Sequence, residues 1–383
     1  MPEFKSHEVL TLTVAEKLGF VLVIANALGA SAMKYITSTF YRPSTYPSKA
    51  VLVESQRFRS VLARSNTRMH QTQSPPSCET YKLWLKEKAQ KGYAYAAEDI
   101  ASEGMETRLL WVGEPWKRGD TKKKVLLYFH GGGYIVALGK GHLSWMKFMK
   151  EQVGKYGEDV SIAVLEYYVA PQKKFPTQLH QAVLALNHLI AAGCSPSNIA
   201  IGGDSAGGNL SLAILSHYLH PHPQVPKLLE FSTPLAAALL ISPWVTVATS
   251  SDSFERNKSF DLIVSKLADY WAIEAMGEGV AAAEVAAGRY HAEALLAPES
   301  WWKGLDSVVN FVVTTGGAFE TFIDDIVEFD HKLKAQSGVK TELYVAAQEV
   351  HDGPLFDFTA GRPPSELAIK LTEFLEQGFR AKS

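Results

Sequence analysis

Gly203-Asp204-Ser205-Ala206-Gly207 is the stretch that decides the fold of this 383-residue chain. An apolar segment over residues 198–202 precedes it, and residues 208–215 follow it with helical character. Gly-x-Ser-x-Gly between a strand and a helix is typical of a sharp turn that exposes a serine hydroxyl at the edge of a sheet. The two flanking glycines let two backbones pass close together there. The pattern therefore predicts a nucleophilic Ser205, although small residues around a serine also occur in ordinary turns.

From about residue 105, short β-rich runs alternate with helical patterns, an order that indicates α/β architecture. Runs such as 124–129 are apolar without alternation, which suits strands covered on both faces. We therefore predict a mostly parallel central sheet flanked by helices. The strand candidates are residues 107–113, 124–129, 161–167, 198–202, 236–241, 307–314 and 341–347. The helix candidates lie near residues 143–155, 175–192, 205–219, 320–336 and 364–378.

Two regions fall outside this alternation, and both are candidates for a cap over the edge of the sheet where open α/β sheets bind ligands. We expect an N-terminal helical cap region over residues 1–104 and a cap insertion over residues 245–305. The core then comprises residues 105–244 and 306–383. The tryptophans of the insertion, Trp271, Trp301 and Trp302, indicate either an apolar pocket or the core of the cap itself.

The composition is that of a soluble globular protein, with 46% hydrophobic and 20% charged residues. A net charge of −2 gives no reason to expect nucleic acid as a partner. The two cysteines, Cys78 and Cys194, lie far apart and make neither a disulfide framework nor a metal-ligand cluster. This usage is compatible with a reducing compartment, and we expect an intracellular protein, cytoplasmic or associated with the endoplasmic reticulum.

Residues 18–33 form an uncharged N-terminal run that falls short of the ~20 apolar residues needed to span a bilayer. Glu3, Glu8 and Glu16 precede it, which makes it a poor secretory signal. One interpretation is an apolar helix that packs over a cleft. The other is a membrane-surface contact or a single-pass anchor.

His130-Gly131-Gly132-Gly133 follows directly on the strand candidate 124–129. Acyl transfer through a serine generates an oxyanion, which needs preorganised N–H donors. Consecutive glycines leave the backbone free to turn its N–H groups inward. We predict that Gly131 and Gly132 are donors from this loop and that Ala206, the residue after the nucleophile, is the third. Standing alone, the loop would also fit a glycine-rich turn.

His351 is the predicted general base, because it follows the strand candidate 341–347 and lies after Ser205 in the chain. Imidazole is the side chain whose ordinary pKa suits removal of the serine proton near neutral pH. The rival histidines lie inside helical or cap segments rather than after a late strand. These rivals are His180, His217, His220 and His291.

The acid that orients the base should follow the strand candidate 307–314, and Glu320 lies there at the boundary between loop and helix. A loop edge fixes a carboxylate against an imidazole better than a helix interior does. Asp324 and Asp325, four and five residues further on, fall within the predicted helix. Glu320 could instead favour the start of the helix or simply be solvated. We expect Glu320 as the acid and keep Asp324 as the alternative.

Together these motifs resemble the hormone-sensitive-lipase-like branch of the α/β-hydrolases over about residues 105–380. Within that branch the chain is most similar to fungal esterases and steryl-acetate hydrolases. The family usually carries Asp at the position of Glu320 and Pro-Glu at the position of Pro171-Gln172. The matching stretches are His130-Gly131-Gly132-Gly133-Tyr134, Tyr168-Val169-Ala170-Pro171 with Phe175-Pro176, Gly203-Asp204-Ser205-Ala206-Gly207-Gly208-Asn209, Ser242-Pro243-Trp244 and His351-Asp352.

The resemblance implies a serine esterase that forms an acyl-enzyme on Ser205 and needs no metal or organic cofactor. His351 removes the serine proton, the three N–H groups hold the oxyanion, and water releases the acyl group. We expect a small-molecule substrate, a short acyl ester of a bulky apolar alcohol. Alternatives on the same fold are acyl transfer or lactone formation, a non-hydrolytic cyclase or isomerase, and a ligand-binding protein without activity.

Overall fold

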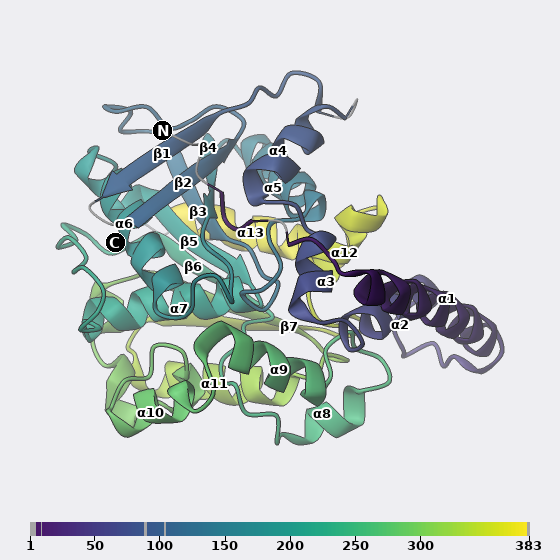
Figure 1. Ribbon diagram of the computed structural model, residues 1–383. Helices are drawn as coiled ribbons and strands as arrows, with labels where there is room; N and C mark the ends of the chain where they lie inside the picture. The colour runs from purple at the N-terminus through teal and green to yellow at the C-terminus, as the bar shows by residue number, and fades with distance from the viewer. Residues whose placement is uncertain (1–4, 9, 88–89, 103–104, 381–383) are drawn as a thin grey trace.

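The structure, a computed structural model, describes residues 5–8, 10–87, 90–102 and 105–380. Its centre is an eight-stranded sheet with the order β1-β2-β4-β3-β5-β6-β7-β8 (Figure 1). Strand β2 pairs antiparallel with both β1 and β4, whereas every pair from β4 across to β8 is parallel. The strands are β1 (Ala97–Ser102), β2 (Met105–Val112), β3 (Lys124–Phe129), β4 (Val160–Glu166), β5 (Ile199–Asp204), β6 (Ala237–Ile241), β7 (Phe311–Gly317) and β8 (Lys340–Ala346). The predicted mostly parallel sheet is confirmed.

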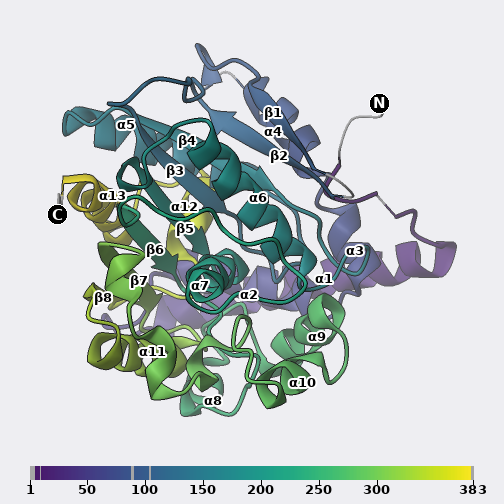
Figure 2. The same ribbon diagram turned by 90° about the vertical axis from the view of Figure 1, so that its left-hand side faces the viewer.

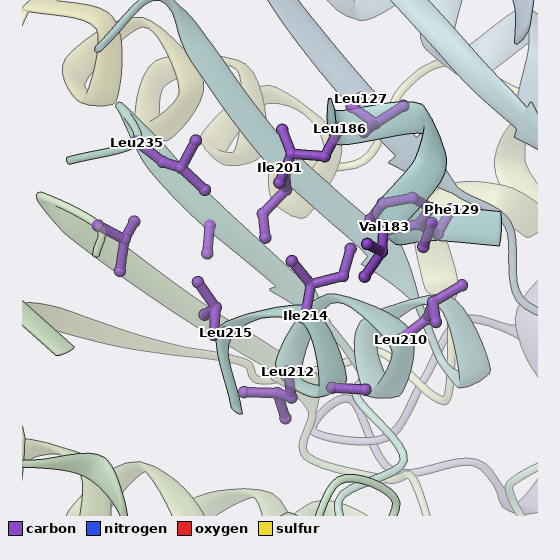
Figure 3. Packing of buried hydrophobic residues seen from close by; sticks show 14 of the residues in the cluster. Leu127, Phe129, Val183, Leu186, Ile201, Leu210, Leu212, Ile214, Leu215 and Leu235 are labelled. Carbon is purple, nitrogen blue, oxygen red and sulfur yellow. The ribbon is translucent and has the colours of Figure 1, made fainter. Parts of the chain in front are cut away.

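Helices cover both faces of the sheet (Figure 2). Helices α6 (Thr177–Ala191), α7 (Ala206–Leu219) and α11 (Ile323–Gln336) pack on one face. Helices α5 (Lys140–Lys155) and α13 (Glu366–Arg380) pack on the other. Alternate side chains of one strand enter the two layers, so that Leu127 packs beneath α6 and α7 while Leu126 packs beneath α5 and α13. Figure 3 shows the first layer, where Leu127 and Ile201 meet Leu186 and Ile214.

Three elements differ from the sequence-based prediction. Strand β1 was missed because Glu98 and Asp99 make it polar, as suits the edge of a sheet. It lies inside the range assigned to the N-terminal cap, so the core sheet begins before residue 105. Strand β7 begins at Phe311 rather than at residue 307, because Leu305–Ser307 form a helical turn. Helix α12 (Gly353–Ala360), directly after His351, was also missed.

The N-terminal region and the insertion are both helical beyond the edge of the sheet, as expected of a cap. The first supplies α1 (Val14–Tyr41), α2 (Lys49–Leu62), α3 (Thr67–Thr72) and α4 (Ser77–Leu85). The second supplies α8 (Asp252–Asn257), α9 (Ser265–Met276) and α10 (Val280–Ala286). Helix α1 begins at a capping box between Thr13 and Glu16, and its far half extends away from the core alongside α2 (Figure 1).

Most of helix α1 is exposed. Only 6% of its most apolar stretch is buried, although it is long and apolar enough to cross a membrane. On its packed side Ala27 and Ser38 are buried, and Phe20, Val23 and Ile24 are half-buried. The Lys34 ammonium donates to the Ser259 carbonyl at 3.0 Å. Its exposed face is apolar. The large side chains of that face include Leu18, Val21, Leu22, Leu28, Met33, Ile36 and Phe40.

We expect Gly207→Ala to destabilise the fold by about 3 kcal/mol or more, because overpacking against an immovable backbone is costly. A Cβ at this position would lie 1.9 Å from the Phe129 carbonyl oxygen. The control is Gly154→Ala on α5, where a Cβ meets nothing within 4 Å. That change should stabilise the helix by about 0.5–1 kcal/mol. Urea unfolding followed by circular dichroism measures both, and equal effects would contradict the steric argument.

Candidate active site

Ser205 lies in a sharp turn between β5 and α7, with φ 51° and ψ −115°. A non-glycine residue in this region of backbone space is strained. The turn is held from the end of β6: the Ser205 N–H donates to the Ile241 carbonyl at 2.8 Å, and the Trp244 N–H donates to the Ser205 carbonyl at 3.1 Å. The serine side chain is 4% exposed, and it lines a cavity. The predicted strand-turn-helix context of the pentapeptide is therefore present.

The glycine loop after β3 lies beside this turn. A Cβ on Gly131 would be 2.3 Å from the Asp204 carboxylate, and Gly132 has φ 104°, so larger residues do not fit. Among the described residues, no hydrogen bond leads from the N–H groups of Gly131, Gly132 or Ala206 to another protein group. The two glycines line the same cavity as Ser205, and Ala206 is the first residue of α7. Free N–H donors close to the serine turn are what an oxyanion requires.

His130 fixes the shape of this loop rather than taking part in proton transfer. Its ring stacks on Tyr167 with centroids 4.3 Å apart, and its Nδ1 lies 2.8 Å from the Gly131 carbonyl. Burial and the neighbouring His142 lower the pKa of His130 to about 3. The imidazole is therefore neutral at physiological pH.

Asp204, the residue before the serine, anchors the turn to the core. Its carboxylate accepts hydrogen bonds from the Tyr128 hydroxyl at 2.5 Å and from His142 Nε2 at 3.1 Å. Burial opposes ionisation of Asp204, but the charge of His142 and these hydrogen bonds lower its pKa below the usual value. The contacts of Tyr128 and His142 with Asp204 could not be predicted from the sequence, because no local sequence pattern indicates a contact between residues so far apart in the chain.

His351 lies in the loop between β8 and α12, as predicted, and its ring is almost fully buried. Its Nδ1 is 3.6 Å from Glu320 Oε2, and its Nε2 is 3.2 Å from Asp352 Oδ2. No hydrogen bond joins His351 to the Ser205 hydroxyl among the described residues, although both line the same cavity. The imidazole therefore sits between two carboxylates, with the ring nitrogen that would serve Ser205 facing Asp352.

Glu320 is buried in the turn between β7 and α11, and the Ser242 hydroxyl donates to its Oε2 at 2.7 Å. Asp324 belongs to the first turn of α11, where it pairs with Arg256 and accepts from the Ser253 N–H at 2.9 Å. Of the two carboxylates weighed from the sequence, the structure thus places Glu320 beside the base. Ser242 was quoted from the sequence as part of a motif, but its contact with the acid was not foreseen.

Burial alone would lower the pKa of His351, but the carboxylates of Asp352 and Glu320 raise it to about 10. Burial also raises the pKa of Asp352 well above its usual value. Both shifts favour keeping a proton within this cluster, because several buried carboxylates cannot all remain ionised around a neutral ring. An imidazolium formed during a reaction would be stabilised in the same way.

The cavity that joins these groups has a volume of about 1250 Å³, including its open mouth. Its apolar wall includes Phe58, Leu62, Ile263, Trp271, Leu355 and Phe356. The structure separates the three cap tryptophans, since Trp271 lines the cavity whereas Trp301 and Trp302 belong to the hydrophobic core. The Trp271 ring packs closely against the glycine loop. A Cβ on Gly133 would lie only 2.2 Å from Trp271 Cε3.

Further motif residues form contacts within the core and with the N-terminal cap region. The Tyr134 hydroxyl donates to Asn209 Oδ1 at 2.8 Å, and the Asn209 amide donates to the Trp244 carbonyl at 2.7 Å. Gln172 exchanges hydrogen bonds with the buried Gln71 of α3 at 2.8 and 3.1 Å. The position at which Gln172 replaces the glutamate usual in the family thus contacts helix α3.

The chain belongs to the α/β hydrolase fold family, since the family model described as alpha/beta hydrolase fold matches residues 126–354. That range contains the glycine loop, the serine turn, Glu320 and His351. The chain is 30% identical over 155 residues to an acetyl-hydrolase of Streptomyces hygroscopicus, which covers 40% of this chain and 46% of that protein. It is 27% identical over 119 residues to human hormone-sensitive lipase, which covers 30% of this chain and 10% of the lipase.

A third relative is neutral cholesterol ester hydrolase 1 of Bos taurus, 30% identical over 124 residues, or 30% of this chain and 29% of that protein. The chain spans less than half the length of these curated relatives. They confirm the resemblance to the hormone-sensitive-lipase-like branch. The finer likeness to fungal steryl-acetate hydrolases stays a prediction.

Solved structures agree on the fold. An esterase from Pseudomonas putida superimposes with a TM-score of 0.63 at 16% identity, over 88% of this chain and 97% of that one. An esterase from the bacterial hormone-sensitive lipase family gives a TM-score of 0.58 at 20% identity, over 96% and 100% of the two chains. At such identities the likeness shows the fold alone.

We expect Asp352→Gly to lower the pKa of the His351 ring by about 1–3 units, because it removes a carboxylate next to Nε2. Glycine suits this position, since Asp352 has φ 53°. Titration of the His351 ring protons by NMR measures the shift. The control is Asp357→Asn, which removes a buried carboxylate that pairs with Arg362 instead. An unchanged His351 pKa in Asp352→Gly would contradict the contact with Nε2.

Proposed function

We propose that this protein is a serine carboxylic-ester hydrolase that acts on short acyl esters of a bulky apolar alcohol. The observation that carries the proposal is the meeting, in one largely apolar cavity, of Ser205, the two loop glycines and His351. A strained nucleophile turn, free N–H donors and a buried base form the set of groups that acyl transfer requires. The acetyl-hydrolase and esterase relatives support the same class of reaction.

In the proposed reaction, the proton that His351 shares with Asp352 stays on the Asp352 carboxyl, whose pKa is raised. The freed His351 Nε2 then accepts the Ser205 proton as Oγ attacks the ester carbonyl. The N–H groups of Gly131, Gly132 and Ala206 hold the oxyanion of the tetrahedral intermediate. The alcohol leaves with the proton carried by His351, and Ser205 keeps the acyl group. Water, activated by His351, then attacks the acyl-enzyme and releases the acid. Glu320 orients the ring through Nδ1 and stabilises its charged form.

The shape of the cavity supports the proposed substrate class. Trp271 presses on the glycine loop and limits the space beside the oxyanion donors, which favours a small acyl group. The remaining volume, lined by α2 and α12, is apolar and large enough for a bulky alcohol.

A panel of p-nitrophenyl esters from acetate to decanoate tests the reaction, and we expect the highest kcat/KM for the shortest acyl groups. Ser205→Ala should abolish turnover and labelling by a fluorophosphonate. Glu320→Ala should lower kcat by about 10³–10⁴, because His351 loses the group that orients it. Asp324→Ala, which removes the exposed carboxylate nearby, should stay close to the wild type.

Each alternative gives a different result in this panel. Equal losses in Glu320→Ala and Asp324→Ala would overturn the choice of acid. A wild type that takes no fluorophosphonate label would indicate a ligand-binding protein, and product formation that survives Ser205→Ala would indicate a cyclase or isomerase. Transacylated product alone, with no free acid, would replace hydrolysis by acyl transfer.

We further propose that α1 lies in the surface of a membrane, where it brings the cap close to apolar esters. Most of the large apolar side chains of the helix are exposed, whereas its buried residues are Ala27 and Ser38, unlike a helix that packs its apolar face on a soluble core. Because Ala27 and Ser38 are buried and Lys34 contacts Ser259 of the insertion, the helix fits an orientation in the plane of the membrane rather than across it. Helix α2, on which α1 packs, supplies Phe58 and Leu62 to the cavity wall. The buried free cysteines fit the intracellular side of such a membrane.

We expect the wild-type protein to sediment with phosphatidylcholine vesicles and a Leu22→Glu/Leu28→Glu variant to bind at least about tenfold more weakly, since binding scales with buried apolar area. Both leucines are exposed, at 71% and 62%. The control is Leu229→Glu/Ile369→Glu, which changes exposed apolar residues elsewhere on the surface. Equal binding of all three proteins would contradict the proposal, as would a change in oligomeric state with no change in vesicle binding.

A further inference from the structure

Asp261 is a fully buried carboxylate that belongs to the cap, in the segment between α8 and α9. Its Oδ2 accepts hydrogen bonds from the Thr321 N–H at 2.7 Å and from the Thr321 hydroxyl at 3.1 Å. Its Oδ1 accepts from the Leu262 N–H at 2.7 Å and from the His351 N–H at 3.2 Å. One side chain of the insertion thus holds the backbone of both loops that carry the proposed acid and base.

We propose that Asp261 is a positioning residue, which sets His351 and Glu320 relative to each other from the cap. The inference rests on the proposed function, because it assigns a task to a residue that touches neither the substrate nor Ser205. Thr321 directly follows Glu320, so the hydrogen bonds to its main chain and side chain fix the turn that carries the acid. The hydrogen bond to the His351 main chain fixes the start of the loop that carries the base.

Other residues of the insertion hold only one of the two loops. The Asn257 amide donates to the Glu320 carbonyl at 2.8 Å, and the Ser253 hydroxyl donates to the Thr321 carbonyl at 2.6 Å. Neither is hydrogen-bonded to the His351 loop in the part of the chain that the structure describes. Asp261 is therefore the contact through which a shift of the cap would change the distance between acid and base.

The N-terminal cap also reaches Asp261. Arg59 of α2 donates to the Asp261 main-chain carbonyl at 2.5 Å. The segment between α8 and α9 that carries Asp261 thus contacts α2 on one side and the two loops on the other. Both parts of the cap converge on this residue, which fits a role in coupling the docking of the cap to the geometry of the site.

The negative charge of Asp261 also acts on His351, in addition to the hydrogen bond that Asp261 accepts from the His351 main chain. Together with Asp352 and Glu320 it raises the pKa of His351. Burial, together with the charge of Glu320, raises the pKa of Asp261 above its usual value, although His351 and the donated N–H groups oppose this shift. Four donors around two oxygens satisfy an ionised carboxylate, and an amide in its place would turn an NH₂ group toward the donors of one loop.

The test is Asp261→Asn, for which we expect kcat to fall by about 10–100-fold with KM nearly unchanged, since small misplacements of catalytic groups cost this much. The ascending limb of the pH profile and the NMR titration of His351 should both move to lower pH, because a negative charge near the ring has been removed. The control is Asp324→Asn, which also removes a carboxylate that joins cap and core, through Ser253 and Arg256. It should change neither quantity.

Should Asp261→Asn fail to fold, Thr321→Val serves as the second variant. It keeps the main-chain bond, loses the hydroxyl bond and should lower kcat about two- to fivefold at constant KM. Equal losses in the two Asp→Asn variants, an unmoved His351 titration, or a wild-type kcat in Thr321→Val would overturn the role of Asp261. A wild type without esterase activity would refute the proposed function, while the NMR titration would still report the link between Asp261 and His351.

Discussion

The close contact between the first turn of α7 and the end of β3 is the constraint on which the site depends. Gly203 and Gly207 face backbone atoms at distances that leave no room for a Cβ. This approach accompanies the strained backbone of Ser205, which lines the same cavity as Gly131 and Gly132. The proposed nucleophile and oxyanion donors thus lie on rigid main chain, and the packing of the sheet beneath them offsets the strain.

His351 is held differently, since its loop follows the edge strand β8 and depends on side-chain contacts. Carboxylates surround it from three segments: Glu320 after β7, Asp352 on its own loop and Asp261 from the cap. The surroundings favour the charged ring, which suits the intermediate but holds the resting Nε2 against Asp352. The proposed base, His351, is therefore the adjustable member of the site, whereas the serine turn and the glycine loop are its rigid frame.

The rigid frame could be predicted from the sequence because its signals are local. A strand, a glycine run and a Gly-x-Ser-x-Gly turn each specify backbone geometry within a few residues, and Glu320 could be chosen over Asp324 from its place at a strand end. The supports could not be predicted. His142 beneath Asp204 and Asp261 beside His351 are contacts over 62 and 90 residues, set by tertiary packing alone. Strand β1 was missed because the edge of a sheet tolerates polar residues, which removes the apolar pattern.

Helix α1 shows a related limit of sequence patterns. An uncharged apolar run has the same composition whether the helix lies in a core, in a membrane or over a cleft, and only the partner of each face distinguishes the three. Here the buried residues of the helix are Ala27 and Ser38, and most of its large apolar side chains are exposed. The two sides of the cap therefore make different contacts. Its outer side is suited to an apolar surface through α1, and its inner side reaches the acid and base through Asp261, with α2 and Arg59 between them.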